Sequence, residues 1–259
     1  MSINYYPPNG FDGSNSVQSL PFYLAVQQGK VAGYSLIDKF GYNSSIGSGA
    51  FETIWETGGQ LIFQTTAQTV NVVSDNVNDD VAGTGARTLR IQGLDSSFDL
   101  VEETLDMDGT TTVTTTQTFL RVFRMSVETA GTSETNEGDI TATYSSTTDT
   151  AATITAGGGQ TLMAVYTIPN GYTGYLLSLS VSSGKDQELL AKVITKNTTV
   201  TNAAVQTKQF LDVRGGLTTI NFNAVTVITE KTDIQVDAKA SSTSSAAASF
   251  DLLLVQDGY

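Results

Sequence analysis

The sequence predicts an all-β protein: two tandem antiparallel β-sandwich domains, jelly-roll-like, preceded by an extended N-terminal arm with one short helix. Short apolar–polar alternations recur along the chain, Gly- and Asp-rich turn signals separate them, and no amphipathic helix longer than two turns follows residue 50. A period of two gives a strand one buried and one wet face, as in antiparallel sheets. Many short strands of this kind indicate sandwiches.

Charge divides the chain into three units. Residues 1–50 carry two acids and two bases, residues 51–156 carry sixteen acids and four bases, and residues 157–259 carry eight acids and seven bases. We therefore expect an N-terminal arm or anchor at 1–50, an acidic β-sandwich domain at 51–156 and a second β-sandwich domain at 157–259. Two domains of about 100 residues are each large enough for a small core.

The arm contains one predicted helix, at residues 22–28. Pro21 suits the first helical position, and Gly29 can end the helix. So short a helix is unstable alone in water, so it must pack on its own domains or on another chain. The flanks at 5–10 and 41–45 are rich in turn residues and read as extended peptide.

The predicted strands alternate apolar and polar residues. They lie at 88–92, 119–127, 161–168, 175–181, 191–195, 220–222, 234–238 and 250–254. The last strand has apolar residues of both parities over 252–255, so we expect it to be buried on both sides. Either a central place in the second domain or a neighbouring chain would bury it.

Composition excludes several classes of chemistry. The chain has no His and no Cys, so it has neither Ser-His nor Cys-His nucleophiles, nor imidazole or thiolate metal ligands. A net charge of −13 argues against nucleic-acid binding, and no apolar run is long enough to suggest a membrane span. The N-terminus lacks the pattern of a secretory signal. We expect no enzyme activity, no cofactor, and no catalytic, cofactor-binding or metal-ligating residues.

Four local motifs have both a functional and a structural interpretation, and the structural one is favoured. Asp75–Asp80 offers oxygen ligands for a hard cation, but a solvated acidic loop is the preferred interpretation. Asp106–Gly109 lacks the later ligands of a calcium loop and predicts a tight turn. The glycine clusters at 83–85 and 157–159 lead into strands rather than helices, which favours hairpin connections over phosphate loops. Glu102 and Glu103 are adjacent on a strand, so they point to opposite faces and cannot act on one substrate.

Arg121 stands among the apolar residues of the strand at 119–127. It either reaches out of a sheet edge or pairs with a carboxylate such as Glu102 or Asp99. A structural ion pair is the default interpretation, and a pair across a subunit interface is the alternative.

Four stretches resemble a known group of proteins. The segments 83–95, 109–118, 137–140 and 159–169 are similar to uncharacterised virion structural proteins of tailed bacteriophages that infect aquatic bacteria and cyanobacteria. The similarity runs from about residue 29 to about residue 185. It implies a β-sandwich component of a phage particle, located at the virion surface.

The resemblance leaves the place in the particle open. The favoured hypothesis is a capsid decoration, cement or head-spike subunit, attached through its N-terminal arm to the major capsid protein or other virion proteins. The alternative is a tail-associated fibre, collar or receptor-binding module. Viral symmetry favours a homo-oligomer, with a trimer preferred. An enzyme acting on host polysaccharide is the least favoured hypothesis.

Overall fold

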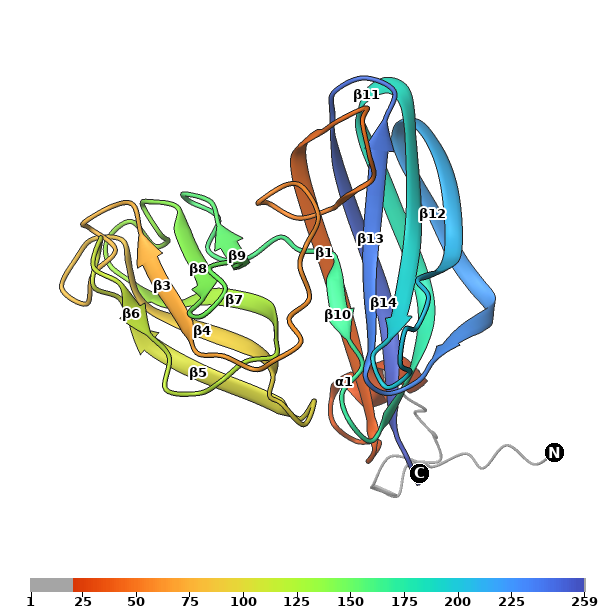
Figure 1. Cartoon of the computed structure of the whole chain (residues 1–259), viewed down its shortest axis with the longest axis horizontal. Coiled ribbons are helices and arrows are strands. Elements are labelled where there is room, and N and C mark those ends of the chain that lie inside the picture. The colour runs from red at the N-terminus through yellow and green to blue at the C-terminus, as the bar shows by residue number, and fades with distance from the viewer. Residues whose placement is uncertain (1–20, 259) are drawn as a thin grey trace, which may run out of the picture.

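The computed structural model describes residues 21–258, which form two β-sandwiches and one short helix (Figure 1). This confirms the all-β fold class. The larger sandwich contains β1 (Tyr34–Ile46), β2 (Glu52–Thr53), β10 (Val165–Thr167), β11 (Tyr172–Asn197), β12 (Gln206–Ile228), β13 (Thr232–Ala240) and β14 (Ser244–Gln256). The smaller one contains β3 (Val70–Ser74), β4 (Ala86–Leu94), β5 (Leu100–Asp106), β6 (Val113–Thr114), β7 (Arg121–Ala130), β8 (Ile140–Tyr144) and β9 (Thr150–Ile154).

The larger sandwich is a single hydrogen-bonded sheet that folds over on itself. β11 and β12 both bend: the β11 register breaks between Ser183 and Glu188, and β12 turns at Gly215–Gly216, where both glycines have positive φ. On one side of the bend the strand order is β1-β14-β11-β12, and on the other it is β10-β13-β11-β12. Two four-stranded layers in this order define a jelly roll.

One apolar cluster fills the space between the two layers. Both halves of β11 contribute to it, with Leu179 before the bend and Val193 after it, and β13 and β14 add Val236 and Phe250. All four side chains are essentially inaccessible to solvent. The alternating inward positions of these strands therefore supply the core, as the period of two predicts.

The smaller sandwich packs a four-stranded sheet against a three-stranded one. The strand orders are β6-β3-β8-β9 and β5-β4-β7, and every pairing is antiparallel. Its core is a second cluster that includes Ile91, Phe119, Met125 and Ile140. The acidic segment at 51–156 thus contains a sandwich of its own, which spans 70–154.

The order of the units corrects the predicted domain layout. β1 pairs along its length with β14, and β2 pairs with β13, so residues 34–53 are part of the jelly roll rather than of an arm or of the acidic domain. The smaller sandwich, called the insert below, is therefore nested between β2 and β10. The two sandwiches are not consecutive along the chain.

The residues of β1 explain why the sequence predicts extended peptide at 41–45 rather than a strand of a sheet. Its inward positions include Lys39, Gly41 and Asn43, so no apolar alternation marks the strand. Gly41 is required where β1 closes onto the opposite layer. A Cβ at this position would overlap the backbone oxygen of Ile54 and the backbone nitrogen of Ala164.

Two other sequence expectations have clear outcomes. Helix α1 spans Phe22–Gln27, and Gly29 follows it with a φ of +67°, as expected. β14 lies centrally between β1 and β11, but the expectation that both of its faces are buried is wrong: Leu252 and Leu254 are buried, whereas Leu253 and Val255 on the other face are partly exposed. The flank expected at 5–10 lies outside the described residues.

Gly41→Ala tests the close approach at β1. The new methyl group has to displace backbone rather than a flexible side chain. We therefore expect the free energy of unfolding to fall by about 1–3 kcal/mol. Gly49→Ala is the matched control, because a Cβ at Gly49 meets nothing within 4 Å. Equal urea midpoints for the two variants would contradict the packing described here.

Candidate functional site

The acidic loop at 75–80 is organised around one fully buried carboxylate, that of Asp79. Both of its oxygens accept hydrogen bonds from the protein. The donors are the hydroxyl of Ser74 at 2.6 Å and the backbone N–H groups of Ala86, Glu137 and Gly138 at 2.7, 2.9 and 2.9 Å. Asp79 therefore ties three segments of the insert together, which is a structural role.

The other oxygens of this loop also serve local turns. Asp75 accepts from the backbone N–H of Asp139 at 2.8 Å, and Asp80 accepts from that of Ala82 at 2.9 Å. Within residues 21–258, no group of three or more acidic, His or Cys side chains is arranged to hold a metal ion. The loop's oxygens are thus committed to the fold.

The remaining acidic motifs have the same character. The carboxylate of Glu103 accepts from the backbone N–H groups of Thr116 and Gln117, and Glu102 accepts from the side chain of Gln92. Gly109 has a φ of +54° in a turn closed by Thr111 N–H to Asp108 oxygen at 2.8 Å. These residues shape turns and strand edges, as their sequence contexts indicated.

The junction between the insert and the jelly roll is built around Arg121 at the start of β7. Its guanidinium forms a bidentate ion pair with Asp233 on β13, with Nε to Oδ1 at 2.8 Å and Nη2 to Oδ2 at 2.9 Å. Nη1 donates to the carbonyl oxygens of Gln64 and Leu120, and the hydroxyl of Thr167 donates to Asp233. The Arg121 and Asp233 side chains are only 6% and 4% exposed.

Asp233 replaces the partners expected for Arg121. Glu102 and Asp99 are near in sequence, whereas Asp233 lies 112 residues further along and on the other sandwich. The expectation of a structural ion pair is correct in kind and wrong in partner. Periodicity along one strand carries no information about which strand of another sheet lies against it.

A second cation is buried at the same junction. The ammonium group of Lys39 on β1 donates to the carbonyl oxygen of Phe123 and lies over the ring of that residue. Burial, followed by repulsion from Arg124, lowers the pKa of Lys39 to about 7. Phe123 also packs against Tyr166, with ring centroids 4.9 Å apart. The ion pair, hydrogen bonds and ring contacts at this junction join the two sandwiches. Their presence is explained without a bound substrate.

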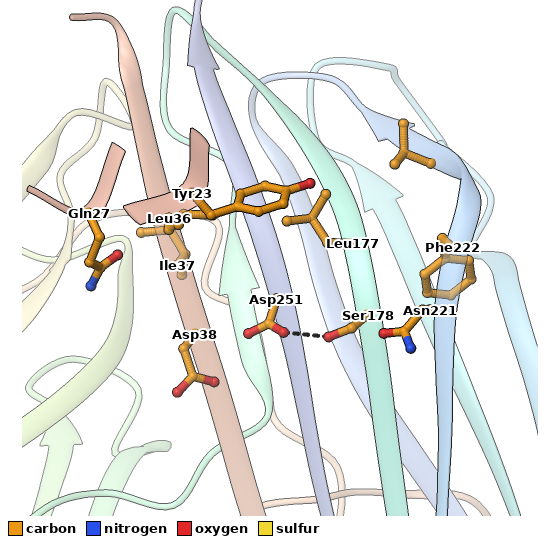
Figure 2. Close-up of a pocket in the computed structure, with 11 residues that line it drawn as sticks. Tyr23, Gln27, Leu36, Ile37, Asp38, Leu177, Ser178, Asn221, Phe222 and Asp251 are labelled. Atoms are coloured by element: carbon orange, nitrogen blue, oxygen red, sulfur yellow. Dashed lines mark hydrogen bonds between the residues drawn. The ribbon is translucent and has the colours of Figure 1, made fainter. Parts of the chain in front are cut away.

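A groove of about 510 Å³ crosses the outer face of the jelly roll (Figure 2), and Arg124 of the insert donates to the carbonyl oxygen of Asp38 in its lining at 3.1 Å. Tyr23 of α1 lies along one side of it, and Phe222 of β12 lies on the other. Below Tyr23 in the view of Figure 2, Asp38 of β1 and Asp251 of β14 occupy directly opposed positions of the strand register. The groove therefore combines aromatic walls with a polar floor.

The floor of the groove carries two like charges side by side. Burial, together with the nearby Asp251, raises the pKa of Asp38, and Ser178 donates its hydroxyl proton to Asp251. Like charges in opposed positions destabilise a sheet unless a donor or cation neutralises them. This arrangement can accept hydrogen bonds from a polyhydroxyl ligand. Sequence reasoning missed it, because Asp38 and Asp251 are far apart in the chain.

Exposed apolar side chains also occur on two segments, which contribute Tyr23 and Val225 to the lining of the groove. Helix α1 exposes Phe22, Tyr23 and Leu24 by 47%, 51% and 43%. The segment that comprises β12 and the loop before it exposes Val200, Val205, Phe210, Leu217, Val225 and Val227. Contiguous exposed apolar surface is typical of contact sites for other proteins.

The fold and these surfaces define an all-β protein in which a jelly roll carries an inserted sandwich. In the part of the chain that the structure describes, no helix is long and apolar enough to span a membrane. Neither a family model nor a curated protein matches the sequence.

Among solved structures, the chain is similar to one from the structure of infectious bursal disease virus, Gx strain. The two share 10% sequence identity, and the match covers 87% of this chain and 72% of that chain, with a TM-score of 0.26. A likeness at this TM-score supports no inference about function.

Lys39→Met tests the buried ammonium group. In the folded chain the pKa of Lys39 is about 7, against an ordinary value of 10.5, so between these pH values the unfolded chain binds more protons. The free energy of unfolding therefore rises with pH across this window, by up to about 1.4 kcal/mol per pH unit, and the group adds no slope below pH 7. We expect the variant to lose this rise and to melt higher than wild type at pH 7.

The measurement is thermal unfolding at several pH values between about 7 and 9.5, which stays below the range where tyrosines titrate. The exposed Lys30→Met variant is the control and should keep the wild-type slope. Parallel curves for wild type and Lys39→Met would show that Lys39 is not the group responsible.

Proposed function

We propose that this chain is a structural, non-enzymatic protein of a bacteriophage virion, attached to the capsid surface as a decoration, cement or head-spike subunit. The sequence resemblance to virion structural proteins of tailed bacteriophages supports the proposal. So does the commitment of the acidic motifs to the fold, since the insert's conspicuous carboxylates hold turns and segments in place. The partner in this proposal is the major capsid protein or another virion protein.

The observation that carries the proposal is the apolar surface of α1. Three consecutive large side chains, Phe22, Tyr23 and Leu24, are about half exposed in a helix of only six residues. A helix this short is stable only against other structure, and α1 packs on β1 mainly through Val26 and the edge-to-face contact of Phe22 with Tyr34. The remaining apolar surface is suited to a groove or sheet edge on a neighbouring protein.

The distribution of charge supports an outward position for the insert. Residues 70–154, which form the insert, carry fourteen acids and four bases, a net charge of −10 out of the chain's net −13. A surface of this charge repels similar particles and repels nucleic acid. In Figure 1 the insert lies to the side of the jelly roll, while α1 lies at the end where the described chain begins and ends. A chain anchored through α1 can therefore present its insert to solvent.

The test is incorporation into particles. The triple variant Phe22→Ser, Tyr23→Ser, Leu24→Ser should reduce the amount of this protein in purified virions about tenfold or more, while the variant still folds. The matched control is Val200→Ser with Val205→Ser, which removes similarly exposed apolar surface from the loop before β12. Truncation has to stop before Tyr34, because a longer deletion removes β1 from the jelly roll. Normal incorporation of the triple variant would refute anchoring through this segment.

A tail-associated fibre, collar or receptor-binding module is the second candidate, and the groove on the outer face favours it. Its aromatic walls and paired carboxylates resemble what a sugar-binding surface needs. A density map of the intact virion separates the two candidates. Many copies spread over the head favour decoration, whereas a few copies on the tail axis favour the second candidate.

A further inference from the structure

β12 is the edge strand of both layers of the jelly roll. Both of its halves pair with β11, with a gap at residues 222–225, and no strand in residues 21–258 pairs with its other side. An open edge presents unpaired N–H and C=O groups, so natural proteins protect such edges with charges, prolines or bulges.

The protection of this edge is uneven. The second half of β12 has a register break between Asn221 and Thr226, which interrupts any pairing there. The stretch 209–214 is regular and ends at the Gly215–Gly216 bend. Within the stretch, Phe210 is 51% exposed, and Leu217 just beyond the bend is 68% exposed. A regular, partly apolar edge of this kind is suited to pairing with another strand.

We propose that β12 pairs through its free edge with β12 of a second copy of the chain, antiparallel about a two-fold axis at Val213, so that residues 212–214 lie opposite residues 214–212 of that copy. In this register Asp212 lies opposite Arg214 of the second copy, and Arg214 lies opposite Asp212. Both side chains are on the outer face and exposed, and Arg214 is 70% exposed with only a 3.5 Å contact to Glu188. The two-fold axis thus produces two identical ion pairs, which is the complementarity that an isologous contact requires.

Neighbouring registers of this edge are less favourable. Shifting the axis to residue 212 or 214 places Asp212 or Arg214 opposite its own copy, and like charges directly opposite are destabilising. The charge pattern therefore selects one register as well as one partner.

The insert leaves this edge accessible. In Figure 1 the insert lies beyond β1 and β10, while β12 is on the opposite side of the jelly roll. The contact is a two-fold pair, in contrast to the trimer expected from viral symmetry, and it does not depend on where the protein sits in the particle.

The test uses charge reversal on the full-length chain. Asp212→Arg and Arg214→Asp, each alone, place like charges opposite one another, so each variant should self-associate about tenfold more weakly than wild type or worse. An equimolar mixture of the two restores opposite charges at both positions and should form a heterodimer. The double variant Asp212→Arg, Arg214→Asp should form a homodimer again. Asp106→Arg, which makes the same charge change on an exposed position of the insert, is the control.

Sedimentation velocity over a range of concentrations reads out each species. A wild-type dimer, lost in both single variants and recovered in the mixture, supports the proposal. A monomeric wild type at tens of micromolar overturns it, as does a trimer or any oligomer unaffected by the single variants. Circular dichroism spectra that match wild type confirm that each variant is folded.

Discussion

The position of the insert depends on the ion pair between Arg121 and Asp233. It joins the first residue of β7 to β13, in a site from which water is nearly excluded. A buried charge without a partner is strongly unfavourable, so each of these residues requires the other to be in place. The guanidinium carbon also lies over the rings of Phe63 and Phe98, 4.9 and 5.7 Å from their centroids. A short linker, an insert loop and a jelly-roll strand therefore meet at one point, and the two sandwiches are held in a defined arrangement.

This junction determines which surfaces are left for partners. It occupies the β1 and β10 side of the jelly roll, where the hydrogen bond of Lys39 and the packing of Phe123 against Tyr166 also lie. The β12 edge, the outer groove and the apolar side of α1 remain uncovered. Because the acidic sandwich is nested within the jelly roll, its negative charge lies apart from the apolar surfaces of α1 and β12. This separation suits a protein that contacts neighbours through one part and faces solvent with another.

Much of the fold follows from local sequence. Alternation over 234–238 and 250–254 predicts strands, and Pro21 and Gly29 delimit the only helix in the described residues. β1 escaped prediction because Lys39, Gly41 and Asn43 occupy its inward positions, where local pattern expects apolar side chains. The partner of Arg121, the β12 edge and the groove depend on strand pairing between distant segments. Net charge identified the acidic unit, but nesting is a property of topology, which composition does not encode.

Differential scanning calorimetry of Arg121→Met tests most directly whether this ion pair unites the two sandwiches. We expect one cooperative transition for wild type. We expect the variant to lose about 3–5 kcal/mol of stability and its insert to melt separately, below the jelly roll, because Asp233 is left as an unpaired buried charge. Arg90→Met is the control, since Arg90 forms an ion pair with Glu128 at a position 38% exposed. A single transition for Arg121→Met, at the temperature of the control, would contradict the account.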